Sequence, residues 1–139
     1  MSERQRIVVL HATGDRFVAE IRDHVVVIDQ PTEAGGDDVG PTPTELFVTG
    51  LASCVAFYAE RFLRRHRLPL EGLRVECDFE MGERPARVRS VDLHVSVTTD
   101  LTATQEAALR AVIDHCTVHN SLRSPPSVRI RVASNRQAA

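Results

Sequence analysis

Residues 41–58 read Pro41-Thr-Pro-Thr-Glu-Leu-Phe-Val-Thr-Gly-Leu-Ala-Ser-Cys-Val-Ala-Phe-Tyr58, and this segment determines what the rest of the chain must build. Thr42, Pro43 and Glu45 fit a capping box with a proline in the first turn, so a helix begins here. The helix can run to about His66, where basic side chains and then a proline and a glycine end it. We therefore expect one long helix with a cysteine near its middle.

This helix has no charged residue from Leu46 to Tyr58, and apolar side chains cover every face. A helix that is apolar all round must also be buried all round. Its length of roughly 35 Å is about the width of the whole domain, which a two-layer monomer of this size does not wrap completely. We therefore expect a homodimer in which the partner covers part of the helix.

Strand patterns surround the helix on both sides. Arg4–Ala12, Arg16–Arg22 and His24–Asp29 are rich in Val, Ile and Phe, are separated by turn residues, and predict an antiparallel meander. The glycine-rich residues 30–41 form a loop. Leu73–Met81 alternates between apolar and charged residues, which indicates a strand with one solvated face.

The remaining elements follow the same patterns. Residues 91–97 alternate like a strand and would pair with Leu73–Met81. Thr102 opens a second capping box, and the helix after it carries Cys116 on its apolar stripe; residues 119–122 add a further turn. Ser127–Ala133 alternates as a final strand, and the last six residues are expected to fray. These elements predict one α+β domain over residues 1–139.

Composition excludes several classes of function. The chain has 139 residues and a formal net charge of -2, so no basic surface is available for nucleic acid. The chain has no uninterrupted apolar run that approaches the ~20 residues a membrane span needs, and no secretory signal is recognised. We therefore expect a cytoplasmic protein with reduced thiols. All 17 basic residues are Arg, which excludes lysine Schiff-base chemistry and lysine-dependent phosphate loops.

The three cysteines lie in different settings. Cys77 alternates inward within a strand, as a small apolar residue would. Cys54 and Cys116 form no local C-x-x-C motif, so neither a thioredoxin-type motif nor a zinc ribbon is present. A metal site from these two cysteines with His115 and His119 would lack half of the usual signature, and we expect none. The residues alone leave open whether each cysteine is structural or reactive.

The two cysteine segments nevertheless have a familiar form. Gly40–Cys54 resembles the cysteine helix of the OsmC/Ohr superfamily, the osmotically inducible and organic hydroperoxide resistance proteins. His24–Asp29, the glycine pair at 35–36, His115–Leu122 and Pro126–Ile130 are similar to the same family. The resemblance covers nearly the whole chain. It implies an OsmC-like intertwined α+β homodimer, in which antiparallel sheets surround two long central helices and the active sites lie at the subunit interface.

The resemblance also implies a reaction, the reduction of organic hydroperoxides without a cofactor. Cys54 would be the peroxidatic cysteine that becomes a sulfenic acid, and Cys116 the resolving cysteine that condenses with it to a disulfide. An external dithiol would then regenerate the pair. This requires Cα atoms within about 7 Å of each other and a cation that keeps Cys54 as a thiolate.

The cation and its orienting acid are implied less directly. In the hydroperoxide resistance branch, an Arg from the N-terminal strands keeps the peroxidatic cysteine as a thiolate. Arg16 is our candidate for this Arg, with Arg22 as the alternative. The branch's catalytic Glu aligns with Thr44, whereas Glu45 lies one residue later, about 100° further around the helix. Glu45 is therefore both a site candidate and a capping residue. This departure places the chain in the broader OsmC-like branch.

Two other functions remain open at this point. A protein of the same fold could bind a small apolar ligand at the interface without turnover, which Thr44 in place of Glu would favour. A redox sensor that is oxidised once and passes the signal to a partner is the third interpretation. Both differ from a peroxidase in lacking efficient turnover.

Overall fold

The computed structural model of the chain describes residues 4–135 and has the predicted α+β character. The predictions for residues 1–3 and 136–139, including most of the expected fraying at the end, lie outside the described residues. The elements, in chain order, are β1 (Ile7–Thr13), β2 (Arg16–Ile21), β3 (His24–Ile28), a 3-10 turn (Thr32–Ala34), α1 (Pro43–Arg65), β4 (Arg74–Gly82), β5 (Arg87–Ser96), α2 (Ala103–Ile113) and α3 (Thr117–Arg123).

The strands form two antiparallel sheets. β1, β2 and β3 make the predicted meander, with Phe17 of β2 opposite Ile28 of β3. The hairpin turns use positive backbone φ angles at Gly14 and Arg22, which reverse the chain within two residues. β4 and β5 form the second sheet, in which Cys77 lies opposite Leu93, so the predicted pairing of these strands is confirmed.

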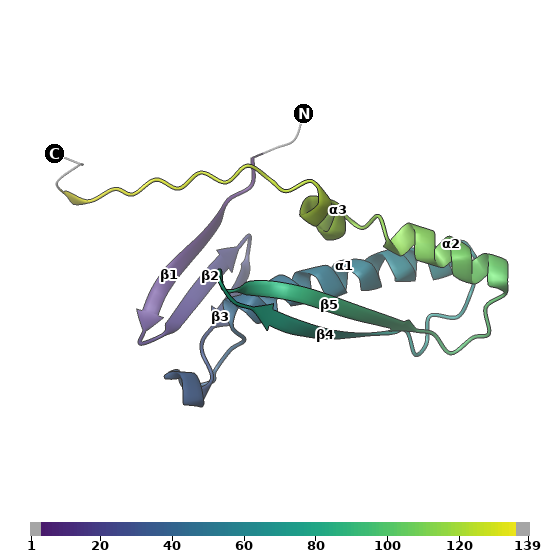
Figure 1. The fold of residues 1–139 in the computed structure, drawn as a ribbon, viewed down its shortest axis with the longest axis horizontal. Helices are drawn as coiled ribbons and strands as arrows, with labels where there is room; N and C mark the ends of the chain where they lie inside the picture. The colour runs from purple at the N-terminus through teal and green to yellow at the C-terminus, as the bar shows by residue number, and fades with distance from the viewer. Residues whose placement is uncertain (1–3, 136–139) are drawn as a thin grey trace.

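The long helix α1 begins as the sequence predicts. The Thr42 hydroxyl accepts a hydrogen bond from the Glu45 amide, and the Glu45 carboxylate accepts one from the Thr42 amide. By length and composition alone α1 could cross a membrane. In the structure, however, it lies between the β4–β5 sheet and the helices α2 and α3 (Figure 1), which is the position of a core helix.

The apolar core follows the length of α1. Near its C-terminal end, Ala59, Phe62 and Leu63 pack against Leu109 of α2. In its middle, Leu51 and Val55 pack against Cys116. We call α1, β4, β5, α2 and α3 the body of the molecule, because nearly all buried apolar residues lie there.

The β1–β3 sheet, which we call the N-terminal sheet, projects from one end of the body (Figure 1). All seven residues of β1 are exposed, and they include the apolar run Ile7–Leu10. Since both faces and one edge of β1 are open, this single chain leaves the sheet without the apolar layer that a sheet requires.

The predicted final strand at Ser127–Ala133 is wrong for the single chain. Residues 124–134, which we call the C-terminal segment, are extended but pair with no strand in the described part of the chain. Val128, Ile130 and Val132 are 75%, 85% and 79% exposed, so the alternation is present without a surface to cover. A strand obtains its hydrogen bonds from a neighbour, and Figure 1 shows the segment running away from the body.

The position of Cys116 also differs from the prediction. α2 ends at Ile113, and Cys116 is the N-cap of the separate helix α3 rather than the last residue of the α2 stripe. The extra turn expected at residues 119–122 is therefore a helix of its own. This break directs the Cys116 side chain inward toward α1.

Candidate functional site

The structure brings Cys54 and Cys116 together, although 61 residues separate them in the sequence. Cys54 lies in the middle of α1 and is half-buried, while Cys116 is 0% exposed. Both are free thiols, and they pack in one cluster with Leu51 and Val55. One thiol is thus partly accessible to solvent, and the other is enclosed beside it.

The surroundings of Cys116 keep it as a neutral thiol. Burial raises the pKa of Cys116, and the adjacent Cys54 thiol raises it further. The amides of His119 and Val118 at the start of α3 lower this pKa without reversing the effect. The His119 amide donates to the Cys116 sulfur at 3.4 Å, which fixes the position of the sulfur beside α1.

A groove lies on the same side of α1 as the two thiols, and we call it the thiol-side groove. Its volume is about 320 Å³, and it is mainly apolar. Phe47 and Leu51 precede Cys54 by seven and three residues, so they share its helix face. His119 lines the other side, next to Cys116. The remaining lining residues are Val88, Arg89, Ser90, Val91, Leu93 and Leu122.

Arg16, the predicted cation, is held by two acids. Its Nη2 lies 3.2 Å from a carboxylate oxygen of Asp37, and its Nε lies 3.9 Å from one of Asp29. That Nε is buried and has no hydrogen-bond partner among the described residues. Within this chain the charged partners of Arg16 are thus Asp29 and Asp37, and no described ion pair or hydrogen bond links it to Cys54.

Asp29 organises the glycine loop and was missed by the sequence analysis. Its side chain is 1% exposed and accepts hydrogen bonds from the amides of Gln30, Asp37 and Val39. The pKa of Asp29 is lowered, chiefly by the hydrogen bond from the Gln30 amide and further by the other two amides and by Arg16. These effects outweigh burial, which acts to raise the pKa. A Cβ on Gly36 would lie 2.1 Å from the Gln30 carbonyl oxygen, so only glycine fits. An aspartate directly before a glycine loop was the available signal.

Glu45, the predicted acid, is placed away from the thiols. It lies nine residues before Cys54, which is two and a half helical turns, so the two side chains point to opposite faces of α1. Its carboxylate accepts the Thr42 amide at 2.9 Å. Glu45 instead lines a hollow of about 350 Å³ with Cys77 and Phe79 of β4. The structure supports its capping role.

The third cysteine lies in surroundings that differ from those of the other two. Burial and then Asp78 and Asp92 raise the pKa of Cys77, which favours an unreactive thiol. Among residues 4–135, no group of three or more His, Cys, Asp and Glu side chains is placed to hold a metal ion.

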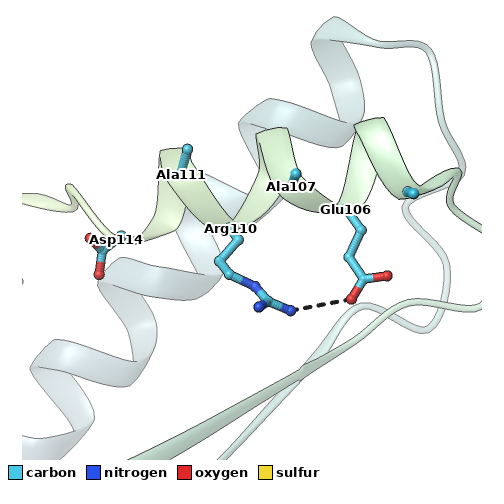
Figure 2. Close-up of a pocket in the computed structure, with 6 residues that line it drawn as sticks. Glu106, Ala107, Arg110, Ala111 and Asp114 are labelled. Atoms are coloured by element: carbon cyan, nitrogen blue, oxygen red, sulfur yellow. Dashed lines mark hydrogen bonds and ion pairs between the residues drawn. The ribbon is translucent and has the colours of Figure 1, made fainter.

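A hollow larger than the thiol-side groove lies away from the thiols. Figure 2 shows it on the outer face of α2, where Ala107 and Ala111 leave space and Arg110 pairs with Glu106 at 3.3 Å. Its volume is about 660 Å³, but small residues and one surface ion pair provide no reactive group. The thiol pair therefore remains the candidate site.

Comparisons with known proteins identify the family of the chain. The family model described as OsmC-like protein matches residues 35–131, which contain both cysteines. The chain belongs to the OsmC-like protein family. No curated protein matches it in sequence. The resemblance seen in the cysteine segments is thus confirmed at the level of the family.

Several solved structures share the OsmC-like fold. An osmotic stress induced and detoxification response protein from Psychrobacter arcticus has a TM-score of 0.78 at 21% identity, covering 87% of this chain and 90% of that one. An OsmC-like protein from Mycoplasma pneumoniae has a TM-score of 0.75 at 18% identity, covering 90% and 91%. The organic hydroperoxide resistance protein OsmC from Legionella pneumophila has a TM-score of 0.65 at 21% identity, covering 88% and 92%. At these identities the likeness concerns the fold.

Proposed function

We propose that this OsmC-like protein is a cysteine-based peroxidase that reduces organic hydroperoxides through a Cys54–Cys116 disulfide cycle in the cytoplasm. The observation that carries the proposal is the contact between a half-buried thiol and a fully buried one. Such a pair has the asymmetry that the reaction needs, because oxidant reaches Cys54 first and Cys116 is already in place to respond.

The cycle has three balanced steps. The Cys54 thiolate attacks the terminal oxygen of the hydroperoxide, so that the O–O bond breaks and Cys54 becomes a sulfenic acid; the alkoxide that leaves takes a proton from solvent and becomes the alcohol. The Cys116 thiol then attacks that sulfur, so that water leaves and a disulfide forms. An external dithiol reduces the disulfide by thiol–disulfide exchange, and both cysteines return as thiols while the dithiol becomes a disulfide.

The lining of the thiol-side groove supports organic hydroperoxides, rather than hydrogen peroxide, as substrates. Phe47, Leu51 and Leu122 provide an apolar lining beside Cys54, and burial of an alkyl or aryl group there is favourable by about 25 cal/mol per Å². Hydrogen peroxide has no apolar group and gains nothing from this lining. We therefore propose apolar hydroperoxides as the substrate class.

We further propose that the protein works as a homodimer. The chain exposes 11274 Å², whereas a folded monomer of 15.4 kDa exposes about 7200 Å². Counted over two chains, the excess is about 8000 Å², which is above the roughly 2000–5000 Å² in total that obligate dimers commonly bury and leaves ample surface for such an interface. The open β1 strand and the exposed Val128, Ile130 and Val132 are the surfaces that a second copy would cover.

The homodimer also provides a place for Arg16. Its sheet has few contacts with the body of its own chain, so docking of the sheet onto a second copy would bring the guanidinium to that copy's cysteines. The buried Nε of Arg16, which has no hydrogen-bond partner among the described residues, supports this role. Asp29 and Asp37 would then hold the cation in position.

The test is oxidation of the reduced protein with one equivalent of cumene hydroperoxide, followed by intact-mass and peptide analysis. We expect a Cys54–Cys116 disulfide and one equivalent of cumyl alcohol. Cys54→Ser should abolish alcohol formation, Cys116→Ser should trap the sulfenic acid, and Cys77→Ser is the matched control with unchanged turnover. A wild-type protein that forms no such disulfide would refute the proposal.

One observation favours the alternative, a non-catalytic protein that binds small apolar ligands. Glu45 is engaged in the capping box on the opposite face of α1, so this glutamate does not lie beside Cys54. In that case Cys54→Ser leaves ligand binding in the thiol-side groove intact, and no alcohol forms with any hydroperoxide.

A further inference from the structure

A second groove lies between α1 and α2, in the half of the body where Figure 1 shows the two helices side by side. Its volume is about 430 Å³, which is in the size range of small-molecule sites. Phe62 forms a buried floor, and Ala108 and Val112 of α2 form an apolar wall. We call it the arginine groove because of the side chains around it.

The rim of the arginine groove carries only basic or uncharged groups. Arg61, Arg65 and His66 from α1 and His115 after α2 line it, and none of its lining residues is acidic. Among the residues that the structure describes, Arg61 and Arg65 take part in no ion pair.

The nearby acids are engaged elsewhere. Arg64 binds both carboxylate oxygens of Glu60, at 2.8 and 2.7 Å, which leaves Arg61 stacked over the Phe57 ring at 5.3 Å. Asp114 binds Arg123 at 2.8 Å. The positive charge of the arginine groove is therefore not neutralised by the fold.

We propose that the arginine groove binds a small organic anion with an apolar body, of the class of medium-chain carboxylates. A guanidinium offers a planar fork of donors that matches a carboxylate, and the apolar floor and wall accommodate an alkyl chain. From Tyr58 to His66 the groove follows α1 for roughly 12 Å, which suits such a chain. Both the charge and the apolar lining are needed.

This site is separate from the thiol chemistry. Neither Cys54 nor Cys116 lines the arginine groove, although Tyr58, which lines it, also packs beside Cys116 and shares a hydrogen bond of 2.9 Å with the Thr117 hydroxyl. The binding proposed here therefore does not depend on the peroxidase cycle, and either proposal can be refuted without the other.

The experiment is an NMR titration of the full-length protein with octanoate and with uncharged octanamide. We expect octanoate to bind with a Kd on the order of 1 mM, shifting the amides of α2 and of the second half of α1. Octanamide should bind about tenfold more weakly, because the charge-assisted hydrogen bonds are lost. The double variant Arg61→Gln/Arg65→Gln should weaken octanoate binding by about the same factor.

Two controls separate this site from general charge effects. Arg74→Gln/Arg87→Gln removes the same net charge from residues outside the groove and should leave the octanoate Kd unchanged, as should Cys54→Ser. Equal binding of octanoate and octanamide would overturn the proposal, as would equal weakening by the two double variants or the absence of octanoate binding to wild-type protein.

Discussion

The body and the N-terminal sheet of this OsmC-like protein have similar apolar patterns but different burial. In the body, Leu63 of α1 is 0% exposed, because helices and a sheet cover it from two sides. In the N-terminal sheet, Val25 is 64% exposed although its strand is equally apolar. An apolar pattern therefore indicates which face of a helix or strand must be buried. Whether that face is buried depends on the other elements or chains that pack against it.

The largest effect is expected from Ile130→Asp in the C-terminal segment. If a second copy covers this apolar face, each dimer would bury two unpaired carboxylates, and the dimer dissociation constant should rise by about 1000-fold or more. Sedimentation velocity over a concentration series measures this change.

The matched control for that substitution is Arg129→Asp. It places the same side chain on the opposite face of the extended segment, so the dimer should persist. If Ile130→Asp sediments like the wild-type protein, the C-terminal segment lies outside any interface and the comparison between the two regions needs another explanation.

Leu63→Ala tests the packing of the body. Truncation of a fully buried leucine removes apolar contacts and leaves a cavity, so the free energy of unfolding should fall by about 3 kcal/mol. Urea denaturation followed by circular dichroism gives the value. Val25→Ala in the N-terminal sheet is the control, and in an isolated monomer it should cost no more than about 0.5 kcal/mol. Similar costs at both positions would show that Val25 is covered in solution.

Asp29→Asn tests the loop that joins the two regions. Because the pKa of Asp29 is lowered in the folded protein, its carboxylate stabilises the fold above the ordinary aspartate pKa, and this contribution is lost as pH falls through the lower folded value. The variant should therefore be less stable at pH 7, and the two stability curves should converge below about pH 4.

Thermal unfolding between pH 7 and pH 2 measures this convergence. Asp23→Asn, at an exposed turn, is the control and should follow the wild-type curve. A constant difference between Asp29→Asn and wild-type protein at every pH would contradict the role given to the charge.

The smallest effect is expected from Thr117→Val beside the thiol pair. It removes the hydrogen bond to the Tyr58 hydroxyl, which is partly exposed, so the free energy of unfolding should fall by about 1 kcal/mol or less. Tyr58→Phe and the double variant complete a mutant cycle in urea denaturation. A coupling energy of zero would show that the two hydroxyls are satisfied by water.

Much of the body could be predicted from the sequence, because its signals are local. The Thr42 and Thr102 capping boxes are both present as expected, and the alternation of β4 and β5 gave their pairing. These signals depend on neighbours within a few residues. The contact of Cys54 with Cys116 was implied only by the family resemblance, since no periodicity relates positions so far apart.

The remaining differences have physical causes that a pattern does not contain. Ser127–Ala133 has strand alternation, but a strand forms only where another strand supplies its hydrogen bonds. Cys116 leaves α2 because the chain turns after Ile113 and starts α3. The sequence pattern places Asp29 at the end of a strand. Its carboxylate, however, accepts hydrogen bonds from amides up to ten residues later, at Val39, which no local pattern indicates.

The complete enclosure of Cys116 has a consequence for damage by excess oxidant. A sulfenic acid left waiting on Cys54 is vulnerable to a second oxidation, which converts it irreversibly to a sulfinic acid. In the proposed cycle the Cys116 sulfur is already in contact, so the first oxidised species would be captured inside the protein before another molecule of oxidant diffuses in. The protein should thus tolerate oxidant concentrations that inactivate proteins whose second thiol must travel to the first.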